Sequence, residues 1–211
     1  KKNSSNKYYF GRDFNILRDE NNLIHYHDNK GEILLPEPNL IGDHQLYNIS
    51  TAIAASRKLF NVKDNNVKNA VVKIKLKGRL EEIKSGKLKN MIGKNRLIID
   101  GGHNLSSAIS IAHWIKQQSQ EVHLICGMMK DKPHVEFIDN FKEIVKSITL
   151  VDIPNSEGSI SKEDFKNKLG IKNLFLAKSI EDSIKSKNKF KNNIVLCVGS
   201  LYLAGEILNL N

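Results

Sequence analysis

The sequence predicts an α/β protein whose main part is a Rossmann-like, mostly parallel sheet with helices on both faces. From residue 97 onward, short apolar strands alternate with amphipathic helices, which is the order that a covered parallel sheet requires. Before residue 40 the chain offers only brief strands and turns. A short meander cannot bury a core alone, so we expect these strands to belong to a larger sheet.

The first forty residues are expected to form short strands joined by turns. Residues 28–31 read DNKG, which is a turn signal, and Pro36 and Pro38 end the last strand. The expected strands are 8–10, 15–17, 23–26 and 32–35.

A helix is expected over 43–60, because apolar side chains recur there at helical spacing and Asp43 is a suitable N-cap. Residues 71–76 are then predicted to be a strand. The lysine- and glycine-rich stretch 82–96 is predicted to be a loop or hairpin at a domain boundary, which we place between residues 82 and 83.

The second half alternates regularly between strands and helices. The expected strands are 97–100, 122–126, 148–151, 173–176 and 194–198. The expected helices are 104–118, 134–146, one beginning at 162, 179–187 and 201–209. Ser161, with Asp164 three residues later, resembles a capping box at the start of the third of these helices.

Composition narrows the class of function. The net charge is +10 and the pI is about 9.5, but the lysines are scattered and no RNA-binding aromatic motif accompanies them. Solvated lysine-rich faces, or an anionic small ligand, are therefore favoured over nucleic acid. No run is long and apolar enough to cross a membrane and no signal peptide is evident, so we expect a cytoplasmic protein. Cys126 and Cys197 lack metal-site spacing and are expected to be buried free thiols.

The first candidate site follows the strand 97–100. Ligands of open parallel sheets bind beyond the carboxyl ends of the strands, and Asp100 stands at such an end. Gly101 and Gly102 allow close backbone approach, and the next helix presents N–H groups suited to phosphate. Asp100 could hold ribose hydroxyls and His103 could donate to a phosphate oxygen. The competing interpretation is that Asp100 or Asn104 only caps the helix.

Two further candidates lie upstream. Arg79, beside a glycine near the boundary, could clamp phosphates across a cleft, or could be a solvated side chain of a basic linker. His44 and Asn48 lie one helical turn apart; the amide could pair with an adenine or ribose, or the two could be a surface pair. No histidine or cysteine spacing predicts a metal site in this chain.

Taken together, these segments resemble the folylpolyglutamate synthases and dihydrofolate synthases of the Mur ligase superfamily. The matching segments, in order, are YFGRDFNI (9–16), GDHQLYNISTAIAA (42–55), GRLE (78–81), IIDGGHN (98–104), GMMKDK (127–132) and GSLYLAGEIL (199–208). The resemblance implies that 1–82 is the C-terminal part of the central ATP-binding domain and that 83–211 is the Mur ligase C-terminal domain. Departures from the family pattern occur at Lys77, Gly102, Leu105 and Pro133.

The resemblance also implies a reaction. ATP would activate a folate or dihydropteroate carboxylate as an acyl phosphate, which the amine of L-glutamate then attacks. Arg79 and His103 are implied as catalytic residues, and Asn48, Arg79, Asp100 and His103 as contacts to ATP. Mg²⁺ is implied as a second cofactor. The expected partners are these small molecules, with no nucleic acid and no membrane, and the expected state is a monomer.

One absence qualifies these expectations. The sequence has no G-x-x-x-x-G-K-[ST] segment, and in the family this phosphate loop and the metal ligands lie upstream. We therefore expect a C-terminal fragment that is inactive alone. Two alternatives stay open: another Mur-type amino-acid ligase, or a non-catalytic basic nucleotide-binding module. The choice between dihydropteroate and folate depends on a pterin pocket that is not in this sequence.

Overall fold

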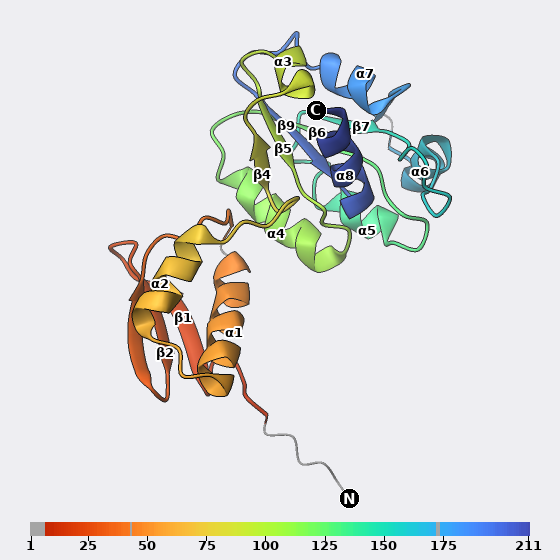
Figure 1. Ribbon diagram of the computed structural model, residues 1–211. Helices are drawn as coiled ribbons and strands as arrows, with labels where there is room; N and C mark the ends of the chain where they lie inside the picture. Colours follow the sequence, from red (N-terminus) through yellow and green to blue (C-terminus); the bar gives the residue numbers. More distant parts are fainter. Residues whose placement is uncertain (1–6, 43, 172–173) are drawn as a thin grey trace, which may run out of the picture. The chain divides into compact units, whose positions relative to one another are not determined.

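The computed structural model describes residues 7–42, 44–171 and 174–211 (Figure 1). Contacts divide the chain into two compact units, Lys1–Lys75 and Leu76–Asn211, and each is described here by itself. The expected N-cap Asp43 and the first residue of the expected strand 173–176 lie outside the described residues. None of the described helices is long and apolar enough to span a membrane.

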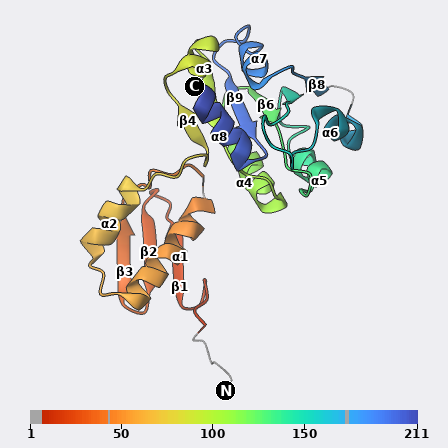
Figure 2. The ribbon, with the colours of Figure 1, turned by 45° about the vertical axis from the view of Figure 1, so that its right-hand side comes forward.

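The first unit is an antiparallel sheet with two helices on one face (Figure 2). Its elements are β1 (Phe14–Arg18), β2 (Ile24–Asp28), β3 (Gly31–Leu35), α1 (His44–Leu59) and α2 (Asp64–Lys73). Alternate strand residues point to the helices, because side chains of a strand alternate between its two faces. The core joins Phe14, Ile16, Ile24, Tyr26, Ile33 and Leu35 to Ile49, Ile53, Val67 and Val71.

Two expectations for the first unit were wrong. Residues 71–73 are the last turn of α2 and not the start of a strand. The β-branched pair Val71 and Val72 is typical of a strand, but Val67 and Val71 share one helix face and both are buried. Residues 8–10 form no strand either, since Phe10 makes only an isolated bridge to Phe14.

The second unit contains a six-stranded sheet with the order β4-β5-β9-β6-β7-β8. Its strands are β4 (Glu81–Ile83), β5 (Arg96–Ile99), β6 (Val122–Cys126), β7 (Ser147–Leu150), β8 (Leu174–Leu176) and β9 (Ile194–Val198). All neighbouring pairs are parallel except β4 with β5. The mostly parallel sheet predicted from the sequence is therefore confirmed.

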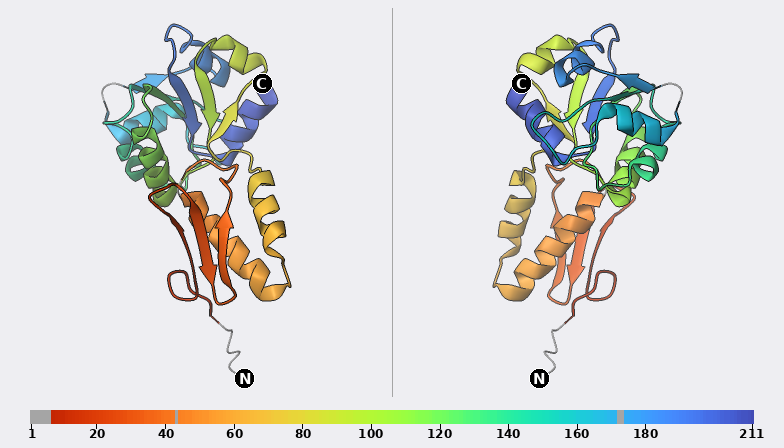
Figure 3. Two further views of the ribbon diagram at one scale, coloured as in Figure 1. Left: turned by 90° about the vertical axis from the view of Figure 1, so that its left-hand side faces the viewer. Right: turned by 90° about the vertical axis from the view of Figure 1, so that its right-hand side faces the viewer.

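Helices cover both faces of this sheet (Figure 3). One apolar cluster packs against α4 (Leu105–Lys116), α5 (His134–Asp139) and α6 (Lys162–Leu169). The other packs against α3 (Lys87–Met91), α7 (Ile180–Lys185) and α8 (Leu201–Leu210). Along β5, Ile98 faces the first cluster, whereas Leu97 and Ile99 face the second. The two buried thiols also divide between the faces, with Cys126 in the first cluster and Cys197 in the second.

Two local expectations are corrected. The stretch 82–96 is not only a loop, because it completes β4 and holds α3. The helix expected over 134–146 ends at Asp139 and continues as turns. The other helices and strands of this unit lie within a few residues of their expected ranges, and β6 and β9 coincide with them.

The strand order places a topological switch point between β5 and β9. β9 lies between β5 and β6, and the helices that follow the neighbouring strands β5 and β9 leave on opposite faces of the sheet. Chain segments that diverge in this way leave space beyond the carboxyl ends of the strands, which is where open α/β sheets bind their ligands. Asp100 directly follows β5 at this point.

Candidate functional site

The candidate site lies where the loops that follow β5, β9 and β6 meet. The N–H of Gly199 donates to the carbonyl of Gly102 (3.0 Å), and the N–H of Gly127 donates to the carbonyl of Val198 (3.3 Å). A Cβ on Gly199, whose φ is +111°, would lie 2.7 Å from the Gly127 carbonyl oxygen. The three loops are thus held together by backbone contacts that a larger residue at 199 would break.

Asp100 is the centre of this arrangement. Its side chain is buried, and the residue is 4% exposed. Oδ1 accepts a hydrogen bond from the Gly102 N–H (2.6 Å), and Oδ2 accepts one from the Leu80 N–H (2.8 Å). The carboxylate therefore ties the turn after β5 to the segment before β4. Asp100 does not cap α4: Asn104 does, in a capping box with Ser107.

The segment that Asp100 holds has an unusual backbone. Leu80 is 1% exposed and has a φ of 44°, in the left-handed region that side chains with a Cβ rarely adopt. Gly78, two residues earlier, also has a positive φ, and its carbonyl accepts from the Gly101 N–H (2.8 Å). Residues held in such conformations need support from their surroundings and are often found at functional sites. Here the support is the Asp100 carboxylate and the burial of Leu80.

Arg79 lies between these two supported residues and is half-buried. Its Nη1 donates to the Gly78 carbonyl (3.1 Å) and would lie 2.9 Å from a Cβ on Gly101. The guanidinium therefore rests against the turn after β5, and a side chain at residue 101 would displace it. A guanidinium carries five N–H donors, of which this bond uses one, so the group is equipped to bind an oxyanion here.

His103 is also half-buried at this turn. Its Nδ1 lies 2.9 Å from the Gly101 carbonyl oxygen, and because a carbonyl only accepts, Nδ1 carries the proton. Nε2 is then the acceptor atom of the neutral ring. The ion pair with Lys132 (2.7 Å) lowers the pKa of Asp131, and the nearby His103 adds a smaller contribution. The loop after β6 therefore approaches His103.

Asn48 belongs to the first unit and is exposed on α1. Its Nδ2 donates to Gln45 Oε1 (3.1 Å), and Gln45 Nε2 lies 3.0 Å from His44 Nε2. The structure thus brings Arg79, Asp100 and His103 together within the second unit and places Asn48 in the other. That Asn48 contacts the same ligand stays a prediction.

Sequence reasoning missed one group of possible metal ligands. His25, His27 and Glu32, on the face of the first sheet opposite α1, offer ligand atoms within 4.8 Å of one another. His25 Nε2 also contacts Asp19 Oδ2 at 3.2 Å. The sequence did contain one signal of this group, because two histidines separated by one residue of a strand lie on the same face of the sheet. Their neighbour Glu32, opposite His27 in the β2–β3 pairing, could be found only once the register was known.

Comparisons with known proteins show which proteins this chain resembles. A folylpolyglutamate synthase of Lacticaseibacillus casei is 24% identical over 94% of this chain and 46% of its own length. A dihydrofolate synthase/folylpolyglutamate synthase of Buchnera aphidicola is 24% identical over 79% of this chain and 41% of its own.

Solved structures show the same fold. A Mycobacterium tuberculosis folylpolyglutamate synthase, complexed with ADP and AMPPCP, has a TM-score of 0.80 at 18% identity and covers 95% of this chain. E. coli FolC in complex with ADP has a TM-score of 0.79 at 21% identity and also covers 95%. These matches cover 48% and 46% of the respective solved chains, so this chain spans about half the length of its relatives.

The family model described as Mur ligase, glutamate ligase domain matches residues 78–201, which include Arg79, Asp100 and His103 and all but the last helix of the second unit. Residues 78–201 make up more than half of the chain, which therefore belongs to the Mur ligase family through its glutamate ligase domain.

Proposed function

We propose that this chain is part of an ATP-dependent ligase that joins L-glutamate to dihydropteroate or to a folate through an acyl phosphate. The observation that carries the proposal is the Asp100 network, which holds Arg79 against the turn after β5 at the carboxyl edge of a parallel sheet. The support from outside the structure is that relatives with this fold are folylpolyglutamate and dihydrofolate synthases, some solved with ADP or its analogues.

Arg79 and His103 are the residues we propose to act on the reacting groups. The Arg79 guanidinium would bind phosphate oxygens of ATP and neutralise the charge that develops during transfer. His103, with its proton on Nδ1, would present Nε2 to the phosphates. When Nε2 is also protonated, it would donate a hydrogen bond to a phosphate oxygen. Asn48 would contact the nucleotide from the first unit.

For Asp100 we propose a positioning role. Both carboxylate oxygens accept backbone N–H groups, and the side chain is almost fully buried, which favours support of Arg79 over direct contact with ribose. Mg²⁺, when bound, would neutralise the phosphate charge and help to orient the transferred group. In the second unit, Arg79 and His103 would hold the nucleotide.

The test is a ligase assay on the complete polypeptide that contains this chain, with dihydropteroate and tetrahydrofolate as alternative acceptors. Phosphate release that needs both L-glutamate and one acceptor supports the proposal, and the preferred acceptor identifies the substrate. Glutamate-independent ATP hydrolysis, or activity only with an unrelated acid, would reject it and favour another Mur-type ligase or a binding module.

Arg79→Ala should weaken the use of ATP in this assay. Loss of a charged hydrogen bond costs roughly 1.5–3 kcal/mol, which is about a 10- to 150-fold fall in kcat/KM for ATP. Arg79→Lys keeps the charge but not the two-pronged geometry, so it should recover only part of the loss. Arg57→Lys, in the first unit, is the control that shows whether an arginine-to-lysine change elsewhere in the chain alters the ATP kinetics. An Arg79→Ala enzyme with unchanged ATP kinetics would remove this residue from the site.

A further inference from the structure

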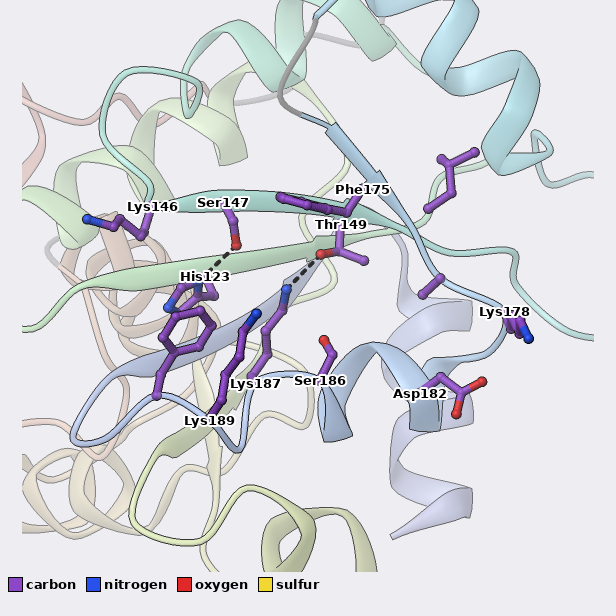
Figure 4. A pocket seen from close by; sticks show the side chains of 13 residues that line it. His123, Lys146, Ser147, Thr149, Phe175, Lys178, Asp182, Ser186, Lys187 and Lys189 are labelled. Atoms are coloured by element: carbon purple, nitrogen blue, oxygen red, sulfur yellow. Dashed lines mark hydrogen bonds between the residues drawn. The ribbon is translucent and has the colours of Figure 1, made fainter.

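A cavity of about 630 Å³ lies in the second unit, and neither Arg79, Asp100 nor His103 lines it (Figure 4). It opens on the sheet face that α3, α7 and α8 cover, over strands β6, β7 and β8. Its volume falls in the range of small-molecule sites in proteins, which is a few hundred to about 1,000 Å³.

The cavity exists because the helices cover only part of this face. The apolar cluster beneath them takes two side chains each from β5 and β9 and only Ile125 from β6. On the same face, β6 and β7 instead carry His123, Ser147 and Thr149. On the opposite face these strands are fully apolar. Strands buried on both faces normally read as continuous apolar runs, so this polar strip is not explained by packing.

Lys187 is the most unusual group in the cavity. It is 6% exposed, follows α7, and donates from Nζ to Thr149 Oγ1 (2.9 Å), as Figure 4 shows. Among the described residues no carboxylate pairs with it, although a buried ammonium group is costly unless it is paired. Burial, and then the neighbouring Lys189, lower the pKa of Lys187, so a bound negative charge would remove this penalty.

Most of the other charged side chains that line the cavity are also positive. Lys146, Lys178 and Lys189 also line it, and Asp182 is the one carboxylate among the described lining residues. Lys146 is held by Glu121 (2.9 Å), but that acid does not line the cavity. A concave site with several cations and low-dielectric walls concentrates anions.

Aromatic rings form part of the wall. Phe190 stacks on His123 with ring centroids 4.0 Å apart, and Phe175 is 58% exposed although it lies beside the buried Lys187. A large exposed ring next to a buried cation offers apolar contact to the body of a ligand while the cation binds its charged end. The cavity is also much larger than a single oxyanion, so the geometry favours an organic anion.

We propose that this cavity is a second ligand site, which binds a small organic anion by seating its phosphate or carboxylate group against Lys187 Nζ and Thr149 Oγ1. Lys189 and Lys146 contribute the surrounding positive field, and Phe175 packs against the apolar part of the ligand. The site is independent of the proposed ligase reaction, because the two share no residue and this one rests only on the second unit.

The test is isothermal titration of the 211-residue chain at constant ionic strength with three probes: phenyl phosphate, benzoate and inorganic phosphate. We expect saturable binding with a stoichiometry of one, tighter for a probe with a ring than for inorganic phosphate. Preference for phenyl phosphate identifies a phosphorylated ligand, and preference for benzoate a carboxylate. Absence of saturable binding of all three probes at 10 mM, roughly the upper limit of weak specific binding, would overturn the proposal.

Three variants locate the site. Lys187→Met keeps most of the length of the side chain without its charge, and Thr149→Val removes the hydroxyl; each should weaken binding about tenfold or more. Lys116→Met, at the exposed end of α4, is the matched control and should bind as the unaltered chain does. Thermal unfolding shows whether each variant is folded. If one of the two pocket variants does not fold, the other is enough to test the site. Equal weakening by Lys116→Met, or none by the two pocket variants, would mean diffuse attraction of ions and would reject the site.

Discussion

At the scale of single residues, the candidate site depends on Asp100, whose carboxylate binds backbone N–H groups. Asp100 accepts N–H groups from residues 2 and 20 positions away, and in doing so fixes the segment that carries Arg79. The sequence pointed to Asp100 through its place after a strand, but left open whether it binds a ligand or caps a helix. It could not show the bond to Leu80, because a contact over 20 residues depends on how the strands pair.

Asp100→Asn should reduce stability. An amide offers one acceptor oxygen in place of two, so its NH₂ group must face either the Leu80 or the Gly102 N–H. A buried donor left without an acceptor costs about 1–3 kcal/mol, which we expect as a lower free energy of unfolding in urea. Asp139→Asn is the control, since its exposed ion pair with Lys142 contributes roughly 0–1 kcal/mol. Equal effects of the two changes would show that the Asp100 network does not support the fold.

His123 should make stability depend on pH. Burial, and then the charge of Lys187, lower the pKa of His123 to about 4, from an ordinary value of 6.5. Between these pH values the unfolded chain binds the proton and the folded chain does not. The contribution of His123 to the free energy of unfolding is therefore complete above pH 6.5. It is lost as the pH falls to 4, with no further loss below that pH.

The loss is on the order of 3 kcal/mol, because each pKa unit corresponds to about 1.4 kcal/mol and the residue is fully buried. Urea unfolding of the His123→Gln chain, compared with the unaltered chain across this range, should show a flatter pH dependence. His113→Gln, on the exposed side of α4, should leave the slope unchanged. A slope that survives in His123→Gln would assign the effect to other groups.

At the scale of elements, β-branched residues explain the main error of the sequence analysis. The stretch 71–76 begins with two valines, and local preference for strands outweighed the helical spacing that joins Val71 to Val67. The strands β6 and β9 were predicted without error, because β9 is an unbroken apolar run of five residues and β6 departs from such a run only at His123. The polar residues within β6 and β7 were a signal of the cavity that was available in the sequence.

Val72→Ala distinguishes the observed helix from the predicted strand. Val72 is 41% exposed, so little packing is lost, and alanine is favoured over valine in a helix by up to about 0.7 kcal/mol. We expect a slightly higher free energy of unfolding. In a strand the same change would lower it, because valine is preferred there. Val71→Ala, at the buried neighbouring position, should be destabilising and confirms which face is packed.

At the scale of the whole molecule, the described residues form three apolar clusters that share no residue. One lies between β1–β3 and the helices α1 and α2, and the other two lie on the two faces of the six-stranded sheet. The parallel sheet and its alternation with helices could be predicted, since both follow from local patterns. The insertion of β9 between β5 and β6 could not be predicted, because it depends on pairing between segments about 70 residues apart or more.

The two units should respond separately to a change in one core. Trp114 is the only tryptophan and is buried in the second unit, so its fluorescence reports the unfolding of that unit. Val71→Ala should lower the urea midpoint of part of the far-ultraviolet circular dichroism signal, while the midpoint of Trp114 fluorescence stays the same. Equal shifts in both signals would show that the two units unfold as one.

The division of the two thiols between the faces of the sheet gives each face a chemical reporter. Burial raises the pKa of both Cys126 and Cys197, the latter to about 12, so neither is a reactive thiolate in the closed fold. Opening of the layer of α4, α5 and α6 would expose Cys126 to a reagent that modifies sulfur, and opening of the layer of α3, α7 and α8 would expose Cys197. The ratio of the two labelling rates would therefore tell which layer of helices opens first.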